Sequence, residues 1–132
     1  MARLLCTENP SLVPTKLLFH ATNVSPNFSN GAMREAGDEA VFTKICEEFG
    51  KNIPACITVY GAHNEQRLTG KHETQSIDQF SYGVSDRGAS IRIPWQVAVD
   101  RKGYLEDRRP NANIDPYVVA RLMVETICGA MK

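Results

Sequence analysis

The sequence lacks an excess of charge of either sign. Its 132 residues hold 15 Lys and Arg against 15 Asp and Glu, so the formal net charge is +0 at pH 7. Surfaces that bind nucleic acid or anionic membranes usually give a domain a cationic field, so we expect neither partner. The chain has no run of about 18 apolar residues that could cross a bilayer, and its first residues lack a leader-like apolar stretch. We therefore expect a cytoplasmic protein.

Cysteine, histidine and glycine-rich motifs are also sparse. The chain has four cysteines with no CxxC pair and no histidine at zinc-site spacing, so we expect free thiols. Cys46 and Cys128 lie on apolar helix faces and are expected in the core. Neither GxxxxGK[ST] nor GxGxxG occurs, which excludes the two common glycine-rich cradles for nucleotides.

Two segments have apolar residues at helical spacing. The first runs from Asn30 to a stop at Gly50, with Ser29 or Asn30 as its cap. The second opens at Asp115-Pro116, an N-cap followed by a proline in the first turn, and carries an apolar stripe from Val119 to Ala130. Both segments predict amphipathic helices.

Three other segments alternate between apolar and polar residues. Two are expected over 80–85 and 90–93, joined near Asp86-Arg87-Gly88, and the third runs from about Gly103 to Arg109. In the third, Leu105 and Asp107 share one face. A further strand is expected between the first helix and the polar loop 61–79. The sequence therefore predicts an α+β fold, with antiparallel strands and two flanking amphipathic helices, after an irregular segment 1–26.

Arginine supplies 9 of the 15 basic residues, and six of the nine lie between positions 67 and 109. Guanidinium groups bind phosphates and carboxylates through two parallel hydrogen bonds, so arginines such as Arg92 on polar strand faces indicate an anionic substrate. Ordinary ion pairs explain the same composition equally well. The acids available for such pairs are Glu65, Glu73, Asp86, Glu106 and Asp107.

Glu106 shares its predicted strand face with Tyr104 and Arg108. A carboxylate in that setting is either a salt-bridge partner or, beside a phosphate, a hard oxygen ligand for Mg²⁺ or Mn²⁺. Arg109, at the end of the same strand, is expected to be exposed to solvent. The loop 67–74 combines a cation, a glycine and an acid, which suits either a lid over a polar substrate or a solvated loop.

From about Asn27 to Lys132 the sequence resembles the C-terminal part of the catalytic domain of type II, eukaryotic-like, glutamine synthetase. Five stretches carry the resemblance: Asn27-Phe28-Ser29, Ala32-Met33-Arg34-Glu35, residues 64–74, residues 86–94 and residues 103–110. The resemblance implies that residues 27–132 are a portion of that domain, and that the family reaction is the ATP-dependent ligation of ammonia to glutamate through glutamyl phosphate. It also implies Mg²⁺ or Mn²⁺ as cofactor and a ring-shaped homo-oligomer.

The resemblance assigns roles to individual positions. It implies catalytic roles for Glu73 and Arg87. It implies glutamate binding by Arg67, Arg87 and Arg108. Nucleotide contacts are implied for Ser29, Arg87, Arg92 and Tyr104, and metal ligation for Glu106.

The chain also departs from the family pattern. The family has a metal-binding histidine two residues before the Asn-Phe-Ser step, where this chain has Ser25. The small N-terminal domain and the earlier metal-binding glutamates of the family have no counterpart. We therefore expect a truncated synthetase that is inactive alone. The alternative is a non-catalytic pseudoenzyme or assembly partner of the full-length enzyme.

Overall fold

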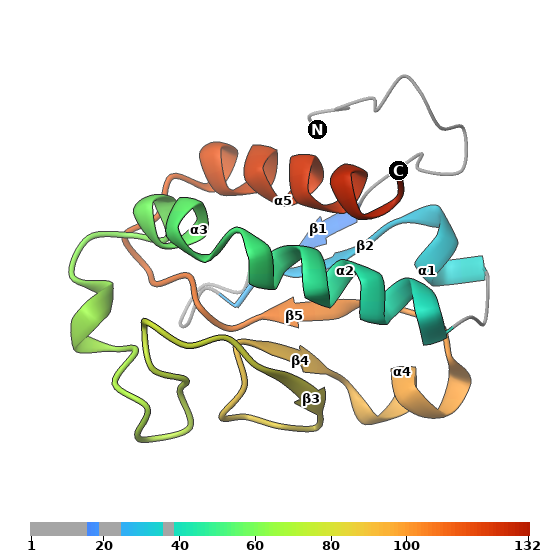
Figure 1. Cartoon of the computed structure of the whole chain (residues 1–132), viewed down its shortest axis with the longest axis horizontal. Coiled ribbons are helices and arrows are strands. Elements are labelled where there is room, and N and C mark those ends of the chain that lie inside the picture. Colours follow the sequence, from blue (N-terminus) through green and yellow to red (C-terminus); the bar gives the residue numbers. More distant parts are fainter. Residues whose placement is uncertain (1–15, 19–24, 36–38) are drawn as a thin grey trace.

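The computed structural model describes residues 16–18, 25–35 and 39–132. Their strands are β1 (Lys16–Leu18), β2 (Asn27–Ser29), β3 (Tyr82–Val84), β4 (Ile91–Ile93) and β5 (Leu105–Asp107). Their helices are α1 (Gly31–Glu35), α2 (Glu39–Lys51), α3 (Ile53–Val59), α4 (Trp95–Asp100) and α5 (Pro116–Ala130), with a 3-10 turn η2 (Asn64–Gln66). The chain is thus a mixture of α and β structure, as predicted. Helices α2 and α5 lie side by side on one face of the sheet (Figure 1).

The strands form one five-stranded sheet in the order β1-β2-β5-β4-β3. Strand β1 lies inside the segment 1–26, which was expected to be irregular. Of the strands that the sequence predicts, β4 and β5 pair antiparallel, as expected. Strands β1 and β2 were not predicted, and they extend the sheet by antiparallel pairing of β1 with β2 and of β2 with β5. Antiparallel pairing is wrong for β3 and β4, which run parallel.

The short loop 85–90 explains how two neighbouring strands of the chain can be parallel. Parallel strands usually need a long crossover, but each of these strands is only three residues long, or about 10 Å. The chain turns at Ser85, whose φ is 56°, and again where the Gly88 amide donates to Asp86 Oδ1 at 2.8 Å. It therefore returns to Ile91, level with Tyr82.

Residues 53–59 form helix α3, so the strand expected before the polar loop is wrong. Several β-branched residues favour a strand there. Pro54, however, fits the first turn of a helix, where its missing N–H costs nothing. Thr58 Oγ1 donates to the Pro54 carbonyl at 2.8 Å, and Cys56 is buried in the core. Tertiary packing and the proline therefore outweigh β propensity.

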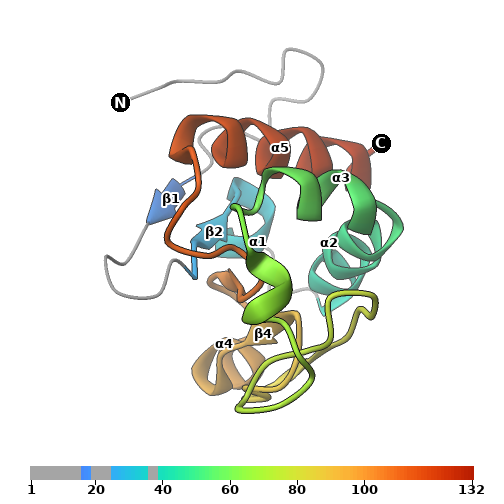
Figure 2. The same cartoon turned by 90° about the vertical axis from the view of Figure 1, so that its left-hand side faces the viewer.

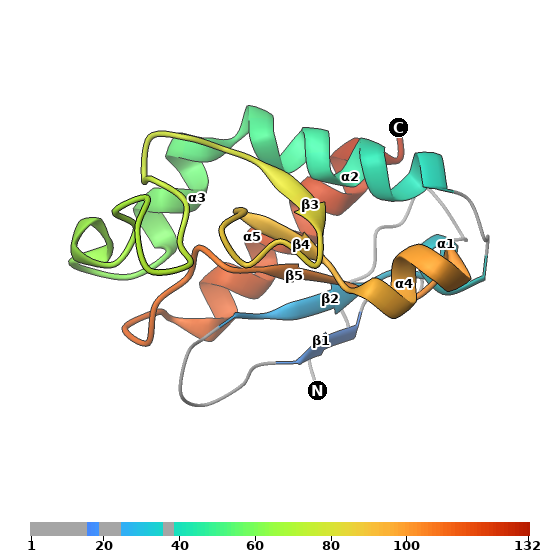
Figure 3. The same ribbon diagram turned by 90° about the horizontal axis from the view of Figure 1, so that it is seen from below.

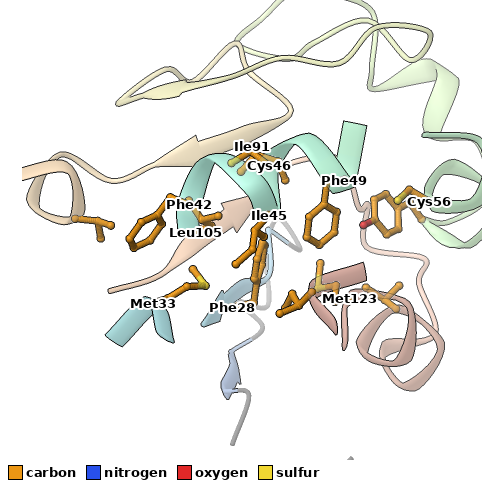
Figure 4. Packing of buried hydrophobic residues seen from close by; sticks show 14 residues of the cluster. Phe28, Met33, Phe42, Ile45, Cys46, Phe49, Cys56, Ile91, Leu105 and Met123 are labelled. Atoms are coloured by element: carbon orange, nitrogen blue, oxygen red, sulfur yellow. The ribbon is translucent and has the colours of Figure 1, made fainter. Parts of the chain in front are cut away.

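The core lies between the sheet and the helices (Figures 2 and 4). Phe28 of β2 stacks at a tilt on Phe49 of α2, with ring centroids 5.1 Å apart. Cys46 is buried, as expected, and it and Cys56 are free thiols. Cys128 is disulfide-bonded, which corrects the expectation of a free thiol there. The buried cluster comprises Phe28, Met33, Phe42, Ile45, Cys46, Phe49, Cys56, Tyr60, Ile91, Val97, Leu105, Val119, Met123 and Ile127.

Neighbouring residues of each strand serve opposite faces of the sheet. Phe28, Ile91 and Leu105 point into the buried cluster. Their neighbours Asn27 and Glu106 lie on the other face, which is the nearer one in Figure 3. Among the described residues, no helix is long and apolar enough to cross a membrane.

Candidate anion-binding site

A row of polar residues crosses the middle of the sheet on the face opposite the helices. Asn27 of β2 pairs with Glu106 of β5, and Glu106 pairs with Arg92 of β4. In-register neighbours point to the same side of a sheet, so register alone brings these side chains together. Tyr104 and Arg108 flank Glu106 at two-residue spacing and share its face.

This row lines a pocket of about 420 Å³, which we call the sheet pocket. Its lining residues are Ser25, Asn27, Arg67, Arg92, Tyr104, Glu106 and Arg108. Three guanidinium groups thus face a single carboxylate, leaving an excess of positive charge. An arrangement of this kind favours an anion with several oxygen atoms, such as a phosphate or a carboxylate.

Glu106 holds two of the arginines in place. Its Oε2 lies 2.5 Å from Arg92 Nε, and its Oε1 lies 3.4 Å from Arg108 Nη1. The Glu106 side chain is 11% exposed, so both ion pairs are shielded from bulk solvent. Arg92 Nε and Glu106 Oε2 are buried and in direct ion contact, without the geometry of a hydrogen bond.

Arg67 enters the sheet pocket from the loop after η2. Its Nη1 donates to the Arg109 carbonyl at 3.1 Å and its Nη2 to the Arg108 carbonyl at 2.7 Å. A guanidinium has five N–H donors, so three remain for an anion. Burial, and then the neighbouring charge on Arg108, lower the pKa of Arg67. Among the described residues no carboxylate forms an ion pair with Arg67, so an anionic ligand would stabilise its charge.

A second pocket, the loop pocket, opens beside the first and shares Arg67 and Arg108 with it. It has a volume of about 710 Å³. Its lining residues are Gln66, Arg67, Thr69, Lys71, His72, Glu73, Thr74 and Arg108. His72 and Glu73 both have positive φ, 53° and 60°, a conformation that is strained for residues other than glycine.

The structure brings Glu73 and Arg87 together at the rim of the loop pocket. Arg87 Nη1 lies 3.5 Å from Glu73 Oε2, and both side chains are more than half exposed. Arg108 connects them to the strand, since its Nε donates to the Arg87 carbonyl and its Nη2 to the Glu73 carbonyl. The predicted residues Arg67, Glu73, Arg87, Arg92, Tyr104, Glu106 and Arg108 therefore form one connected region.

Ser29 is not part of either pocket. It lies buried on β2, and its Oγ accepts a hydrogen bond from Arg34 Nη1 at 2.9 Å. Its nucleotide contact stays a prediction. Asn27, two residues earlier on the same strand face, lines the sheet pocket and was missed. The signal was available, because Phe28 is a clear core residue and alternation places Asn27 on the opposite face.

The expectation that Arg109 is exposed is wrong. Its side chain is 2% exposed and forms an ion pair with Asp107, whose side chain is completely buried. Asp107 shares a face with Leu105, as predicted, and Arg109 continues that face at the next two-residue step. The alternation of residues along the strand therefore places the Arg109 side chain on the buried face. A charged residue can lie in a core when a partner neutralises it there.

The pocket residues that the structure describes do not by themselves form a metal site. In these parts of the chain, no three His, Cys, Asp or Glu side chains are close enough together to hold an ion. Mg²⁺ favours about six oxygen ligands. Glu106 is the one carboxylate among the lining residues of the sheet pocket, and both of its oxygens already face arginines. Metal ligation by Glu106 therefore stays a prediction.

Comparison with known proteins gives matches along most of the chain. It is 53% identical over 117 residues to a glutamine synthetase of Streptomyces hygroscopicus, an alignment covering 87% of this chain and 34% of that relative. It is 48% identical over 122 residues to the glutamine synthetase of Emericella nidulans, with 89% and 33% covered. The chain matches no family model.

The alignment with a third relative covers more of the chain. The chain is 48% identical over 124 residues to the chloroplastic glutamine synthetase of Chlamydomonas reinhardtii, covering 94% of this chain and 32% of the relative. An alignment of that length takes in part of the segment before Asn27, where the sequence analysis found no match. The chain spans about a third of the length of these relatives. About half of the aligned residues are identical, so along most of its length the chain is similar to roughly one third of a glutamine synthetase.

Proposed function

We propose that the chain carries the phosphate- and carboxylate-binding part of the active site of an ATP-dependent glutamate–ammonia ligase. The observation that supports this most is the convergence of Arg67, Arg92 and Arg108 around Glu106 in one pocket. In the proposed reaction the side-chain carboxylate of glutamate attacks the terminal phosphoryl group of ATP. Ammonia then displaces phosphate from the resulting glutamyl phosphate.

The two pockets suit the two kinds of anion in this reaction. Arg92 and Tyr104 line only the sheet pocket, and we assign them to the nucleotide phosphates. Arg67 and Arg108 line both pockets, and we assign them to glutamate and to the phosphoryl group that is transferred to it. Positive charge that is already fixed in place stabilises the transferred group without reorganisation.

Glu73 and Arg87 lie at an exposed place where a lid could act. Both side chains are more exposed than buried, and their 3.5 Å ion pair is solvent-screened. We propose that Glu73 closes over the substrate and accepts a proton from ammonium, and that Arg87 then contacts the phosphoryl group. Both roles agree with their place beside Arg108.

We propose that the chain alone does not turn over. Mg²⁺ or Mn²⁺ is implied by the family resemblance, whereas the described residues supply one carboxylate to the sheet pocket. Further acids, from another segment or subunit of a ring-shaped homo-oligomer, would complete the site. Location in the cytoplasm and the boundary at residue 27 also stay predictions.

One observation favours a second candidate function, that of a non-catalytic partner of an intact synthetase. Glu106 is already neutralised by Arg92 and Arg108, so the sheet pocket is ready for an anion without a metal ion. A phosphate-release assay with glutamate, ammonia, ATP and Mg²⁺ separates the two. Turnover by the chain would refute its inactivity. Co-purification with an intact synthetase, together with anion binding but no turnover, supports the partner.

Calorimetric titration with ATP, and separately with inorganic phosphate, tests the proposed site. We expect saturable binding that Arg92→Gln and Arg108→Gln each weaken about tenfold, or roughly 1.4 kcal/mol. Arg121→Gln is the matched control, because Arg121 pairs with Glu125 on the exposed face of α5, outside both pockets. Equal affinity in all three variants would contradict the proposal, as would the absence of binding.

A further inference from the structure

A buried polar network lies on the core side of β5, behind the sheet pocket. Tyr60 donates its hydroxyl to Asp107 Oδ2 at 2.6 Å. Arg109 donates to the same carboxylate through Nε, 2.9 Å from Oδ1, and through Nη2, 2.7 Å from Oδ2. Its backbone N–H adds a third bond, to Oδ1 at 3.0 Å. Asp107 thus receives four hydrogen bonds in the interior of the protein.

Three aromatic rings enclose the Arg109 guanidinium. Its central carbon lies 5.2 Å from the ring centroids of Tyr60 and Phe80, and 5.6 Å from that of Phe49. Burial alone would lower the pKa of Arg109, but Asp107, Tyr60 and Cys56 together outweigh burial and the pKa is raised. Burial and Asp107 together raise the pKa of Tyr60 well above its ordinary value. The network is therefore a charged pair with a neutral phenol, held rigidly by its surroundings.

Two backbone carbonyls next to this network bind the guanidinium of Arg67. The Arg109 carbonyl accepts from Arg67 Nη1 and, at 2.8 Å, from Asn64 Nδ2. The Arg108 carbonyl accepts from Arg67 Nη2. The direction of these two carbonyls decides where the Arg67 guanidinium lies. Their direction is in turn fixed by the bonds that anchor Arg109 to Asp107, from both its backbone and its side chain.

We propose that Tyr60, Asp107 and Arg109 are positioning residues for Arg67. Through the backbone after β5 they hold its guanidinium at the junction of the two pockets. This inference rests on the proposed function, because it assumes that Arg67 binds the anion. A need for stability alone does not explain the network, since well-packed apolar residues often stabilise a core as well as a buried ion pair does.

Tyr60→Phe is the sharpest test, because it removes one hydroxyl and keeps the ring against Arg109. We expect it to weaken the binding of inorganic phosphate about threefold to tenfold in a calorimetric titration. Ile127→Val, a buried change on α5 away from both pockets, controls for loss of stability. The control is expected to lower the melting temperature and leave phosphate affinity unchanged. Asp107→Asn gives a second variant of nearly the same shape.

A double-mutant cycle shows whether the effect passes through Arg67. In an Arg67→Gln background, Tyr60→Phe is expected to cause no further loss of phosphate affinity. The positioning role is overturned if Arg67→Gln weakens binding while Tyr60→Phe and Asp107→Asn do not. It is also overturned if the two losses are fully additive. If Arg67→Gln alone leaves phosphate affinity unchanged, the proposed role of Arg67 fails, and the positioning role fails with it.

Discussion

Glu106 and Asp107 are adjacent in the chain, yet they have different partners on opposite faces of the sheet. Glu106 contacts Arg92 and Arg108 at the pocket, whereas Asp107 contacts Arg109 and Tyr60 in the core. Because neighbouring strand residues point to opposite faces, Glu106 faces the sheet pocket while Asp107 faces the core. Substitutions at these two positions are therefore expected to weaken anion binding by different routes. At Glu106 the change acts directly on Arg92 and Arg108 in the sheet pocket, and at Asp107 it acts on the buried network and, through it, on Arg67.

Gly103 lies at a position where a side chain would not fit. Its φ is 140°, and a Cβ there would lie 2.8 Å from Val97 Cγ2. We expect Gly103→Ala to lower the free energy of unfolding by about 1–3 kcal/mol, because it combines backbone strain with overpacking. Urea unfolding measures this. Gly129→Ala is the control, since Gly129 lies within α5 in ordinary helical conformation, and there alanine is expected to be neutral or slightly stabilising.

The buried thiol of Cys46 should make the free energy of unfolding depend on pH. Burial, and then the Asp107 charge, raise the pKa of its thiol from 9.0 to about 12. Because the folded state favours the protonated thiol, its contribution is complete below pH 9 and is lost as the pH rises towards 12. The free energy of unfolding should fall by up to about 1.4 kcal/mol per pH unit across this range. Cys46→Ala should reduce that slope in urea unfolding at pH 8 to 10, and an unchanged slope would contradict the assignment.

At the scale of the element, the start of α5 is set by its cap. Asp115 Oδ1 accepts from the amides of Tyr117 and Val118, and Pro116 occupies the first turn. We expect Asp115→Ala to lower the free energy of unfolding by about 1 kcal/mol, because two amides at the helix end lose their acceptor. Asp115→Asn should retain most of this stability, because its amide oxygen can still accept from the two amides. Equal losses for both variants, measured by thermal unfolding, would show that the cap is not the cause.

Periodicity predicted the amphipathic character of α2 and α5 and the two faces of β5, because those features depend on residues close in sequence. The single helix expected over 30–50 is instead described as two helices, α1 (Gly31–Glu35) and α2 (Glu39–Lys51). Periodicity failed at α3, where β-branched residues and helical packing disagree, and at the parallel pair of β3 and β4, which depends on the path of a loop. At the site, the arginine-rich composition indicated an anion. The sharing of Arg67 between two pockets could not be predicted, since it arises from backbone carbonyls far along the chain.

At the scale of the whole molecule, the layers leave one sheet face available. The helices α2 and α5 cover the apolar face of the sheet (Figures 1 and 3). The opposite face carries the row from Asn27 to Arg92. A neutral protein therefore concentrates positive charge locally, at the sheet pocket and the loop pocket. This local excess, rather than a long-range field, is what we expect to attract a phosphate or a carboxylate.

Arg67, Arg92 and Arg108 are proposed to bind one anion together. The most direct measurement follows the side-chain N–H resonances of the arginines by NMR while inorganic phosphate is added. The resonances of these three arginines are expected to shift together with one dissociation constant, while those of the exposed Arg121 and the buried Arg109 do not move. Shifts of similar size at all arginines, or none at the three, would contradict this proposal.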